Sequence, residues 1–146
     1  MPARPAMTPA HAKELLLLHG FCDPRSAEHP KAAAGFLGSL RPYGGHLVEE
    51  NFREVMESLR VLAPELSGAT VDREVVSALW AMCHLARAWG VEPEGMLRRN
   101  GLISATDIET LAGWVATLSY ATMCLLDGSG EEEAFQAYDH DTAQVL

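Results

Sequence analysis

The most reactive side chains in this sequence are six histidines and three cysteines. His19 and Cys22 are three residues apart, Cys83 and His84 are adjacent, and His140 lies between two aspartates in the segment 139–141. A structural zinc site needs four ligands, usually arranged as two close pairs, and no second His/Cys pair has the required spacing. Adjacent residues on a helix also point about 100° apart. We therefore expect no metal ligands and no cofactor.

A cysteine nucleophile needs a histidine close in space, and His19 with Cys22 is the pair that the sequence brings together. Gly20 predicts a helix end between them, so turn geometry alone explains their proximity. The run that begins at Asp127 lacks the glycine and glutamate that a calcium-binding EF-hand loop has at its sixth and twelfth positions. Phosphate-loop, dinucleotide, G-x-S-x-G and H-E-x-x-H patterns are also missing. We expect no catalytic residues and a non-enzymatic protein.

The first-ranked candidate site lies on a helix expected over residues 71–89, with Thr70 as its cap and Gly90 as its stop. At 100° per residue, one face of this helix is polar except for a large aromatic ring at its centre, and it carries Arg73, Ser77, Trp80, His84 and Arg87. Tryptophan and arginine are enriched at interface hot spots, so this face predicts a surface that binds a protein partner, with a preference for acidic regions.

Two intramolecular alternatives explain the same face without a partner. In the first, the chain's own N-terminal helices cover Trp80, and an arginine stacks on its ring. In the second, the acidic C-terminal segment folds back onto the face. Either arrangement would bury the tryptophan within the chain itself.

The helix expected over residues 104–126 carries no charged side chain between Glu109 and Asp127, so it should need cover on nearly every side. Ser104 is its expected N-cap. One apolar stripe of this helix should face the core, namely Ile108, Leu111, Val115, Leu118, Thr122 and Leu126. A second stripe of small residues would admit another helix closely, in the bundle or in a homodimer, and consists of Gly113, Thr117 and Ala121.

An alternative function is the binding of an apolar small molecule between the two uncharged helices. The small residues of the second stripe would leave space there. Four sulfur-containing side chains would line the site: Met82, Met123, Cys83 and Cys124.

Composition supports an all-α fold in one domain. The chain has 146 residues, of which 48% are apolar and 21% charged, and it lacks the period-two runs of β-branched and aromatic residues that indicate strands. We expect a single-domain bundle of five to seven helices around the central pair 71–89 and 104–126. Residues 1–7 should form a flexible N-terminus, residues 8–127 the bundle, and residues 128–146 an acidic C-terminal segment with a short helix ending near Tyr138.

Other expected elements follow from proline, glycine and apolar spacing. These are a helix from Pro9 to His19, a short helix from Pro30 toward Arg41, a helix over 47–62 bounded by Pro64, and a short helix over 93–99. The link Tyr43-Gly44-Gly45 could separate an N-terminal helical pair from the main bundle.

The net charge of −9 is unevenly distributed: residues 104–146 hold eight acidic side chains and no lysine or arginine. Such a chain is a poor candidate for binding nucleic acid, which calls for a basic surface. Its acidic end could engage a basic protein or simply aid solubility. The three cysteines are odd in number and widely spread, which does not suggest a disulfide framework. The leucine run at 15–18 is too short for the core of a signal peptide. Five hydroxyl side chains in residues 110–126 argue against a membrane span there. We expect a cytoplasmic protein.

Overall fold

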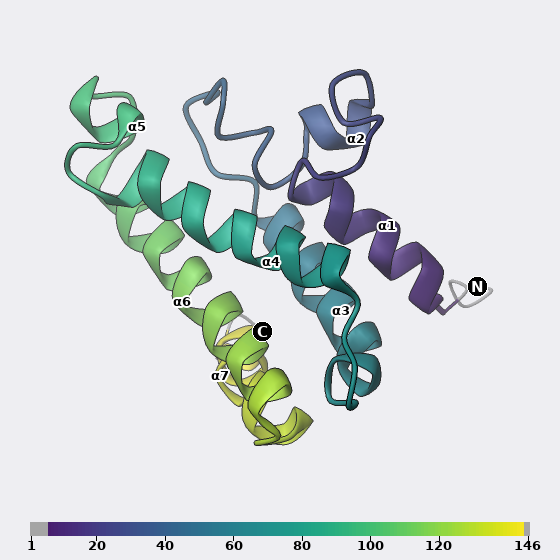
Figure 1. Cartoon of the computed structure of the whole chain (residues 1–146). Helices are drawn as coiled ribbons and strands as arrows, with labels where there is room; N and C mark the ends of the chain where they lie inside the picture. Colours follow the sequence, from purple (N-terminus) through teal and green to yellow (C-terminus); the bar gives the residue numbers. More distant parts are fainter. Residues whose placement is uncertain (1–5, 145–146) are drawn as a thin grey trace, which may run out of the picture.

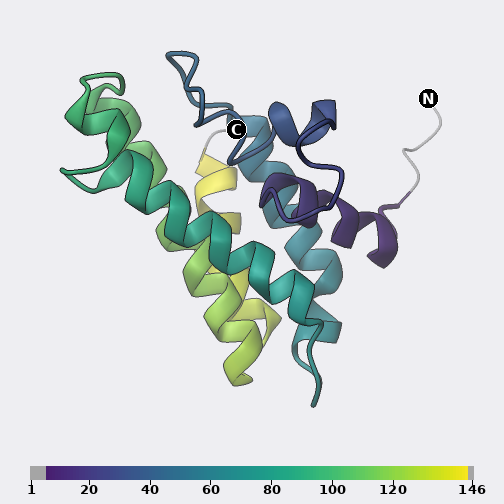
Figure 2. The ribbon, with the colours of Figure 1, turned by 45° about the horizontal axis from the view of Figure 1, so that its top comes forward.

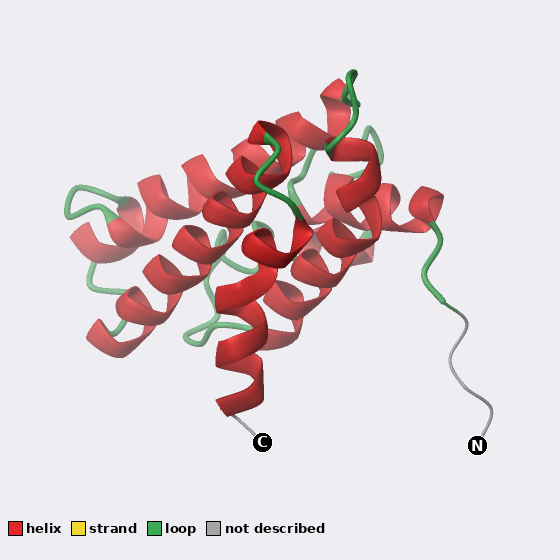
Figure 3. Ribbon diagram, turned by 90° about the horizontal axis from the view of Figure 1, so that it is seen from below, coloured by secondary structure: helices red, strands yellow, loops and turns green. Residues whose placement is uncertain are grey.

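Helices make up all the regular secondary structure of residues 6–144, which are the residues that this computed structural model describes. The predicted all-α bundle is thereby confirmed (Figure 3). Part of the expected flexible N-terminus, residues 1–5, lies outside the described residues, whereas Met7 accepts a hydrogen bond from the Ser58 hydroxyl at 3.6 Å. The elements in order are α1 (Pro9–His19), α2 (Pro30–Ala33), α3 (Glu49–Leu66), α4 (Arg73–Ala86), the π-helical turn η1 (Arg87–Val91), α5 (Met96–Arg99), α6 (Ala105–Asp127) and α7 (Glu131–Gln144).

The arrangement of α4 and α6 leaves an opening between the two helices. The two helices lie together near η1 and α5, and they separate toward the start of α4 and the end of α6 (Figure 1). α1 packs against both α3 and α4, while α7 packs against α6 and α3 (Figures 1 and 2). α6 therefore has α7 on one side and α4 on another, and its last turns extend past the region where α4 covers it.

The ends of α6 follow local signals. The Ser104 hydroxyl accepts a hydrogen bond from the backbone N–H of Asp107 at 3.1 Å, and Gly128 stops the helix with a φ of 84°. The predicted range is therefore nearly correct. The expectation of cover on nearly every side is wrong, because Tyr120 is 40% exposed and Met123 is 50% exposed.

α4 begins two residues later than expected. Asp72, not Thr70, caps it by accepting a hydrogen bond from the backbone N–H of Glu74 at 3.0 Å. Asp72 also forms an ion pair with Lys13 of α1 at 2.7 Å, and this contact fixes the start of α4 against the neighbouring helix. Asp72 is therefore the cap because it has a local partner in Glu74 and a tertiary partner in Lys13.

Gly90 does not stop the helix as expected, because the chain continues beyond α4 as the π-helical turn η1. The backbone N–H of Glu92 donates to the carbonyl of Arg87 at 2.9 Å, which closes the wide turn. A Cβ atom at Gly90 would lie 2.5 Å from Cδ2 of the buried Leu111. A side chain at position 90 would therefore force Leu111 to move, because η1 packs closely against α6.

A fully buried histidine joins α1, α3 and the segment after α2. Nδ1 of His19 accepts a hydrogen bond from the backbone N–H of Phe36 at 2.9 Å, and its Nε2–H donates to Glu54 at 2.8 Å. Lys31 lies 2.7 Å from the same carboxylate. Hydrogen bonding from His19, which outweighs burial, and the nearby Lys31 lower the pKa of Glu54 to about 2.

This network accounts for one error in the predicted elements. α2 ends at Ala33 rather than near Arg41, because the chain turns back so that Phe36 can reach the histidine. A Cβ atom at Gly38 would lie only 2.0 Å from the carbonyl oxygen of Ala32, so the turn depends on glycine there.

The link Tyr43-Gly44-Gly45 does not separate two parts of the chain. The Tyr43 hydroxyl donates a hydrogen bond to Asp107 of α6 at 2.5 Å, and the guanidinium of Arg41 lies 5.5 Å from the ring centre of Trp89. With α1 packed on α3 and α4, the N-terminal helices belong to the same bundle as the rest.

α3 and α7 both extend beyond their predicted ends. α3 runs through Pro64 to Leu66, and the burial of Leu66 favours this extra turn. α7 continues to Gln144 rather than ending near Tyr138. The guanidinium of Arg60 on α3 anchors α7, because it lies 4.4 Å from the ring centre of the buried Phe135 and 2.5 Å from the carboxylate of Asp139.

Candidate functional site

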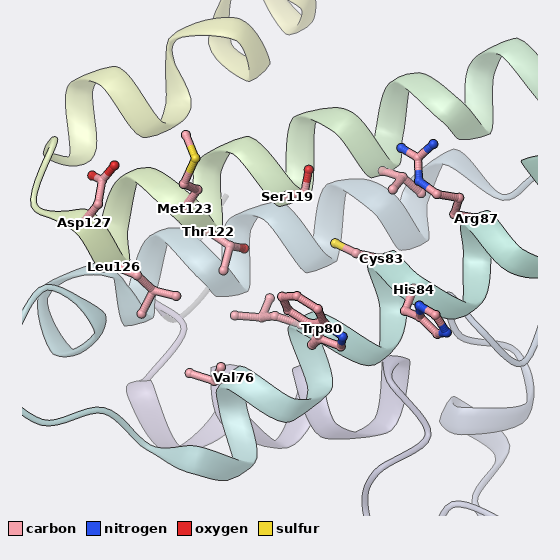
Figure 4. Close-up of a pocket in the computed structure, with 12 residues that line it drawn as sticks. Val76, Trp80, Cys83, His84, Arg87, Ser119, Thr122, Met123, Leu126 and Asp127 are labelled. Carbon is pink, nitrogen blue, oxygen red and sulfur yellow. The ribbon is translucent and has the colours of Figure 1, made fainter.

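The space between the diverging parts of α4 and α6 forms an apolar groove of about 540 Å³, which we call the α4–α6 groove (Figure 4). Leu79 and Val115 are each 1% exposed and form its floor. The α4 side with η1 contributes Val76, Leu79, Trp80, Cys83, His84 and Arg87, and the α6 side contributes Val115, Ser119, Thr122, Met123, Leu126 and Asp127.

Trp80 stands at the edge of this groove and is 74% exposed. A second hollow lies on the other side of its ring and is lined by Arg73, Val76, Ser77, Trp80 and Ala81. The tryptophan is therefore a ridge between two hollows. The alternative in which the N-terminal helices cover Trp80 is wrong, because α1 reaches the start of α4 but leaves this side chain in solvent.

The second intramolecular alternative is also wrong. α7 contacts α6 and α3, not α4, within the described residues. Two of its carboxylates have other partners: Asp139 forms an ion pair with Arg60, and Glu133 accepts a hydrogen bond from the Tyr120 hydroxyl. The acidic C-terminal helix therefore packs behind α6, away from the predicted face.

All five residues of the predicted partner-binding face are exposed. They lie on one side of α4 and its continuation η1, in the order Arg73, Ser77, Trp80, His84 and Arg87. Trp80, His84 and Arg87 border the α4–α6 groove, while Arg73 and Ser77 border the hollow on the other side of the tryptophan. The predicted face is thus one flank of the groove.

Uncompensated positive charge gathers along this flank. Of the ten lysines and arginines in residues 6–144, five form ion pairs: Lys13, Arg25, Lys31, Arg53 and Arg60. Two of the other five lie on the predicted face, Arg73 on α4 and Arg87 on η1. Arg98 and Arg99 lie on α5, outside the groove lining and close in sequence to the exposed Glu92 and Glu94. The acidic residues at the start of α4, Asp72 and Glu74, both pair with Lys13. A chain of net charge −9 therefore presents two arginines that are unpaired within residues 6–144 beside its apolar groove, Arg87 in the groove lining and Arg73 in the neighbouring hollow.

The opposite flank differs in charge. α6 carries no acidic or basic side chain from Thr110 through Leu126. Its contribution to the groove is apolar or neutral until Asp127, which is exposed at the open end and accepts a hydrogen bond from the Ser129 hydroxyl at 2.6 Å. The groove thus has one cationic flank and one neutral flank.

The predicted small-residue stripe faces another part of the molecule. Gly113 and Thr117 border a hollow of about 280 Å³ between α3, α6 and α7, which Tyr138 also lines. Ala121 is fully buried. The close helix neighbour on this side of α6 is therefore α7 of the same chain.

The sulfur residues expected around a ligand are only partly at the groove. Met123 and Cys83 line it, as expected. Met82 is 0% exposed and Cys124 is 1% exposed, and both belong to the core rather than to the groove wall. The space also arises from divergence of the helices and not from the small-residue stripe.

The thiols show no sign of activation. Both ring nitrogens of His19 are occupied, and the Cys22 thiol donates to the carbonyl of Gly20 at 3.2 Å, so the two residues do not form a nucleophile–base pair. Burial raises the pKa of Cys83 to about 11, although nearby Arg87 opposes the shift. A thiol that stays protonated at neutral pH contributes apolar surface to the groove rather than a nucleophile. Among the described residues, no three His, Cys, Asp or Glu side chains are placed to hold a metal ion.

Comparison with protein-family models, with curated proteins and with solved structures gave no match. In the described part of the chain, no helix combines the length and apolar character needed to cross a membrane.

Sequence reasoning found the α4 flank of the groove but missed most of the α6 flank. Thr122 and Leu126 were assigned to the core stripe, whereas Leu126 is 44% exposed at the groove. The apolar stripe of α6 continues for more turns than the facing helix α4 can cover, and this length could have indicated that its last residues are exposed. Ser119, one helical turn after Val115, is the polar residue at which the buried part of the stripe gives way to the groove.

Proposed function

We propose that this chain is a non-enzymatic protein-interaction domain, such as an adaptor, inhibitor or immunity-like protein. Its α4–α6 groove would receive apolar side chains of a protein partner, with Trp80 as the central contact. The observation that supports this most directly is that Trp80 is 74% exposed beside an apolar groove. An exposed aromatic next to exposed Met123 and Leu126 forms the kind of contiguous apolar surface that marks interaction sites.

The open form of the groove favours a protein partner. Small-molecule pockets usually bury most of the ligand, whereas here Trp80 and Met123 are at least half exposed at the rim. A helix or loop laid along the groove would cover both side chains at once. Arginine on the flank adds directed ionic contacts, which improve specificity and the rate of encounter.

Site-specific photocrosslinking tests the proposal. Trp80 is replaced with p-benzoylphenylalanine in cells that normally express the protein, and crosslinked products are identified by mass spectrometry. The matched control carries the same residue at Gln136, which is exposed on α7 away from the groove. We expect a defined protein product at position 80 that the control does not give. Identical products at both positions, or none at position 80, would contradict the proposal.

An apolar small molecule is the second candidate ligand. The groove volume of about 540 Å³ is in the range of small-molecule sites, and the floor at Leu79 and Val115 is apolar and fully buried. Native mass spectrometry of freshly purified protein should then show a bound compound that Val115→Trp displaces. Protein of bare chain mass would count against this candidate.

A second copy of the chain is the alternative protein partner. Of the predicted homodimer stripe Gly113, Thr117 and Ala121, only the first two can contact it, because Ala121 is fully buried. Light scattering of the untagged protein gives the oligomeric state directly. Thr117→Trp should release monomers if that stripe is the interface. A dimer that persists in this variant would place the interface elsewhere.

A further inference from the structure

Building on the proposed function, we infer that the occupant of the α4–α6 groove is an amphipathic helix of a protein partner with acidic residues along one flank only. The acidic flank would lie against α4, and the flank against α6 would be uncharged. The shape of the groove and the charges on its two sides favour a partner helix of this chemistry.

The dimensions of the groove fit a short helix. Its wall on α4 runs from Val76 to Arg87, a rise of about 16 Å at 1.5 Å per residue, and its wall on α6 runs from Val115 to Asp127, about 18 Å. A partner helix of about three turns has the same length. Two helices that diverge from one end already provide the ridges between which a third helix packs, and such a helix anchors itself through residues at i, i+3 or i+4, and i+7.

The charge pattern selects which amphipathic helix fits. Arg73 and Arg87 lie 14 residues apart on the same flank, and neither takes part in an ion pair within residues 6–144. Trp80 lies midway between them. A partner helix would therefore place apolar side chains against Trp80 and the floor, and carboxylates toward Arg73 and Arg87.

The α6 side of the groove offers no counter-charge to a charged residue of the partner. Its groove residues before Asp127 are Val115, Ser119, Thr122, Met123 and Leu126, none of which can form an ion pair. A charged partner residue packed against this wall would lose water without gaining a counter-charge. The one-sided distribution of acid is the distinguishing feature of the inference.

A peptide-display selection on the full chain tests this directly. The library consists of 16-residue helices with fixed leucines at i, i+4, i+7 and i+11, and with Glu, Lys or Gln randomised on both flanks. Selections are run on the wild type and on Trp80→Ala. We expect the wild type to enrich glutamate on one flank and glutamine on the other, and Trp80→Ala to enrich nothing above background.

Charge reversal provides the matched pair of variants. Arg87→Glu should weaken binding of a selected acidic peptide about fivefold, the upper end of what one exposed ion pair contributes, and should shift the selection toward lysine. Arg99→Glu, on α5 and outside the groove lining, should leave both unchanged. The affinity difference between the two variants should shrink at high salt.

The possible contrary outcomes are distinguishable. Peptides that need Trp80 but show no flank bias, or a basic one, would overturn the acidic-helix inference and leave the interaction function standing. No enrichment over Trp80→Ala would overturn the helical occupant, and the photocrosslinking experiment would then decide the interaction function separately. A stable dimer of the free chain that is disrupted by Trp80→Ala would assign the groove to a second copy and likewise overturn the inference.

Discussion

Trp80→Ala should separate binding from folding, because most of this side chain is in solvent before any partner arrives. A tryptophan side chain can bury about 250 Å². With 74% of Trp80 exposed, only about a quarter of that area is buried in the free chain, and it stabilises the fold by at most about 1.5 kcal/mol at 25 cal/mol per Å². The remaining area could contribute up to about 4.6 kcal/mol to an interface. The substitution should therefore cost about 1 kcal/mol in unfolding and 2 to 4 kcal/mol in binding.

Two measurements on the same variants test this ratio. Chemical denaturation gives the free energy of unfolding, and titration with the crosslinked partner or a selected peptide gives the free energy of binding. Trp114→Ala is the matched control, because the partly buried Trp114 packs against the core and its ring stacks on Phe52 with centroids 5.1 Å apart. We expect this control to lose about 3 kcal/mol of stability, as large-to-small substitutions of packed aromatics do.

The reasoning would be refuted by the opposite partition. If Trp80→Ala unfolded as easily as Trp114→Ala, the tryptophan would be part of the core and not a free contact. If Trp80→Ala kept full stability and also full affinity, the groove would not be the binding surface. Either result would remove the main support for the proposed function.

Two further predictions concern the fold that holds the groove in place. Glu54 has its pKa lowered from 4.5 to about 2, so its contribution of about 1 to 2 kcal/mol should be complete above pH 4.5 and disappear as the pH falls toward 2. Denaturation of the wild type and Glu54→Gln should thus differ at pH 6 and converge at low pH; a constant difference would argue against the linkage. Gly90→Ala should destabilise by about 1 to 3 kcal/mol because its Cβ would lie 2.5 Å from Leu111, whereas Gly113→Ala, with nothing within 4 Å, should stabilise by up to about 1 kcal/mol. Equal effects in thermal melts would contradict the close approach of η1 to α6.

Local signals predicted the fold class and most helix positions well. The start of α6 is an example, because the Ser104 hydroxyl and the backbone N–H of Asp107 form a cap whose partners are three residues apart. The stop at Gly128 likewise depends on one residue with a positive φ of 84°. Such features need no tertiary context, so the sequence alone determines them.

The errors all involve partners that are distant in the chain. α2 ends early because Phe36 bonds to His19, and α4 starts at Asp72 because Lys13 pairs with it. The π-helical turn η1 follows the packing of Gly90 against Leu111, which no local spacing rule describes. In each case a long-range contact outweighs the local preference.

The candidate site also has one part that local signals predict and one part that depends on long-range packing. The α4 flank was predictable because helical periodicity places Trp80 between Arg73 and Arg87. Whether Trp80 would be covered was not, since that depends on where α1 and α7 pack.

The stretch of α6 without charged side chains contacts several neighbouring elements, namely α3, α4, η1 and α7. It supplies Leu118 and Leu125 to the core, leaves Ala121 buried, and presents Met123 to the groove. Gly113, Ala116, Ser119 and Tyr120 are exposed, however, so burial alone does not account for the absence of charge along this helix. The charged side chains lie instead on the elements around α6: acid on α7, which packs behind it, and, on α4 and η1, arginine that is unpaired within the described residues. This distribution places a neutral wall opposite a cationic one across the groove, which is why we infer a partner with a single acidic flank.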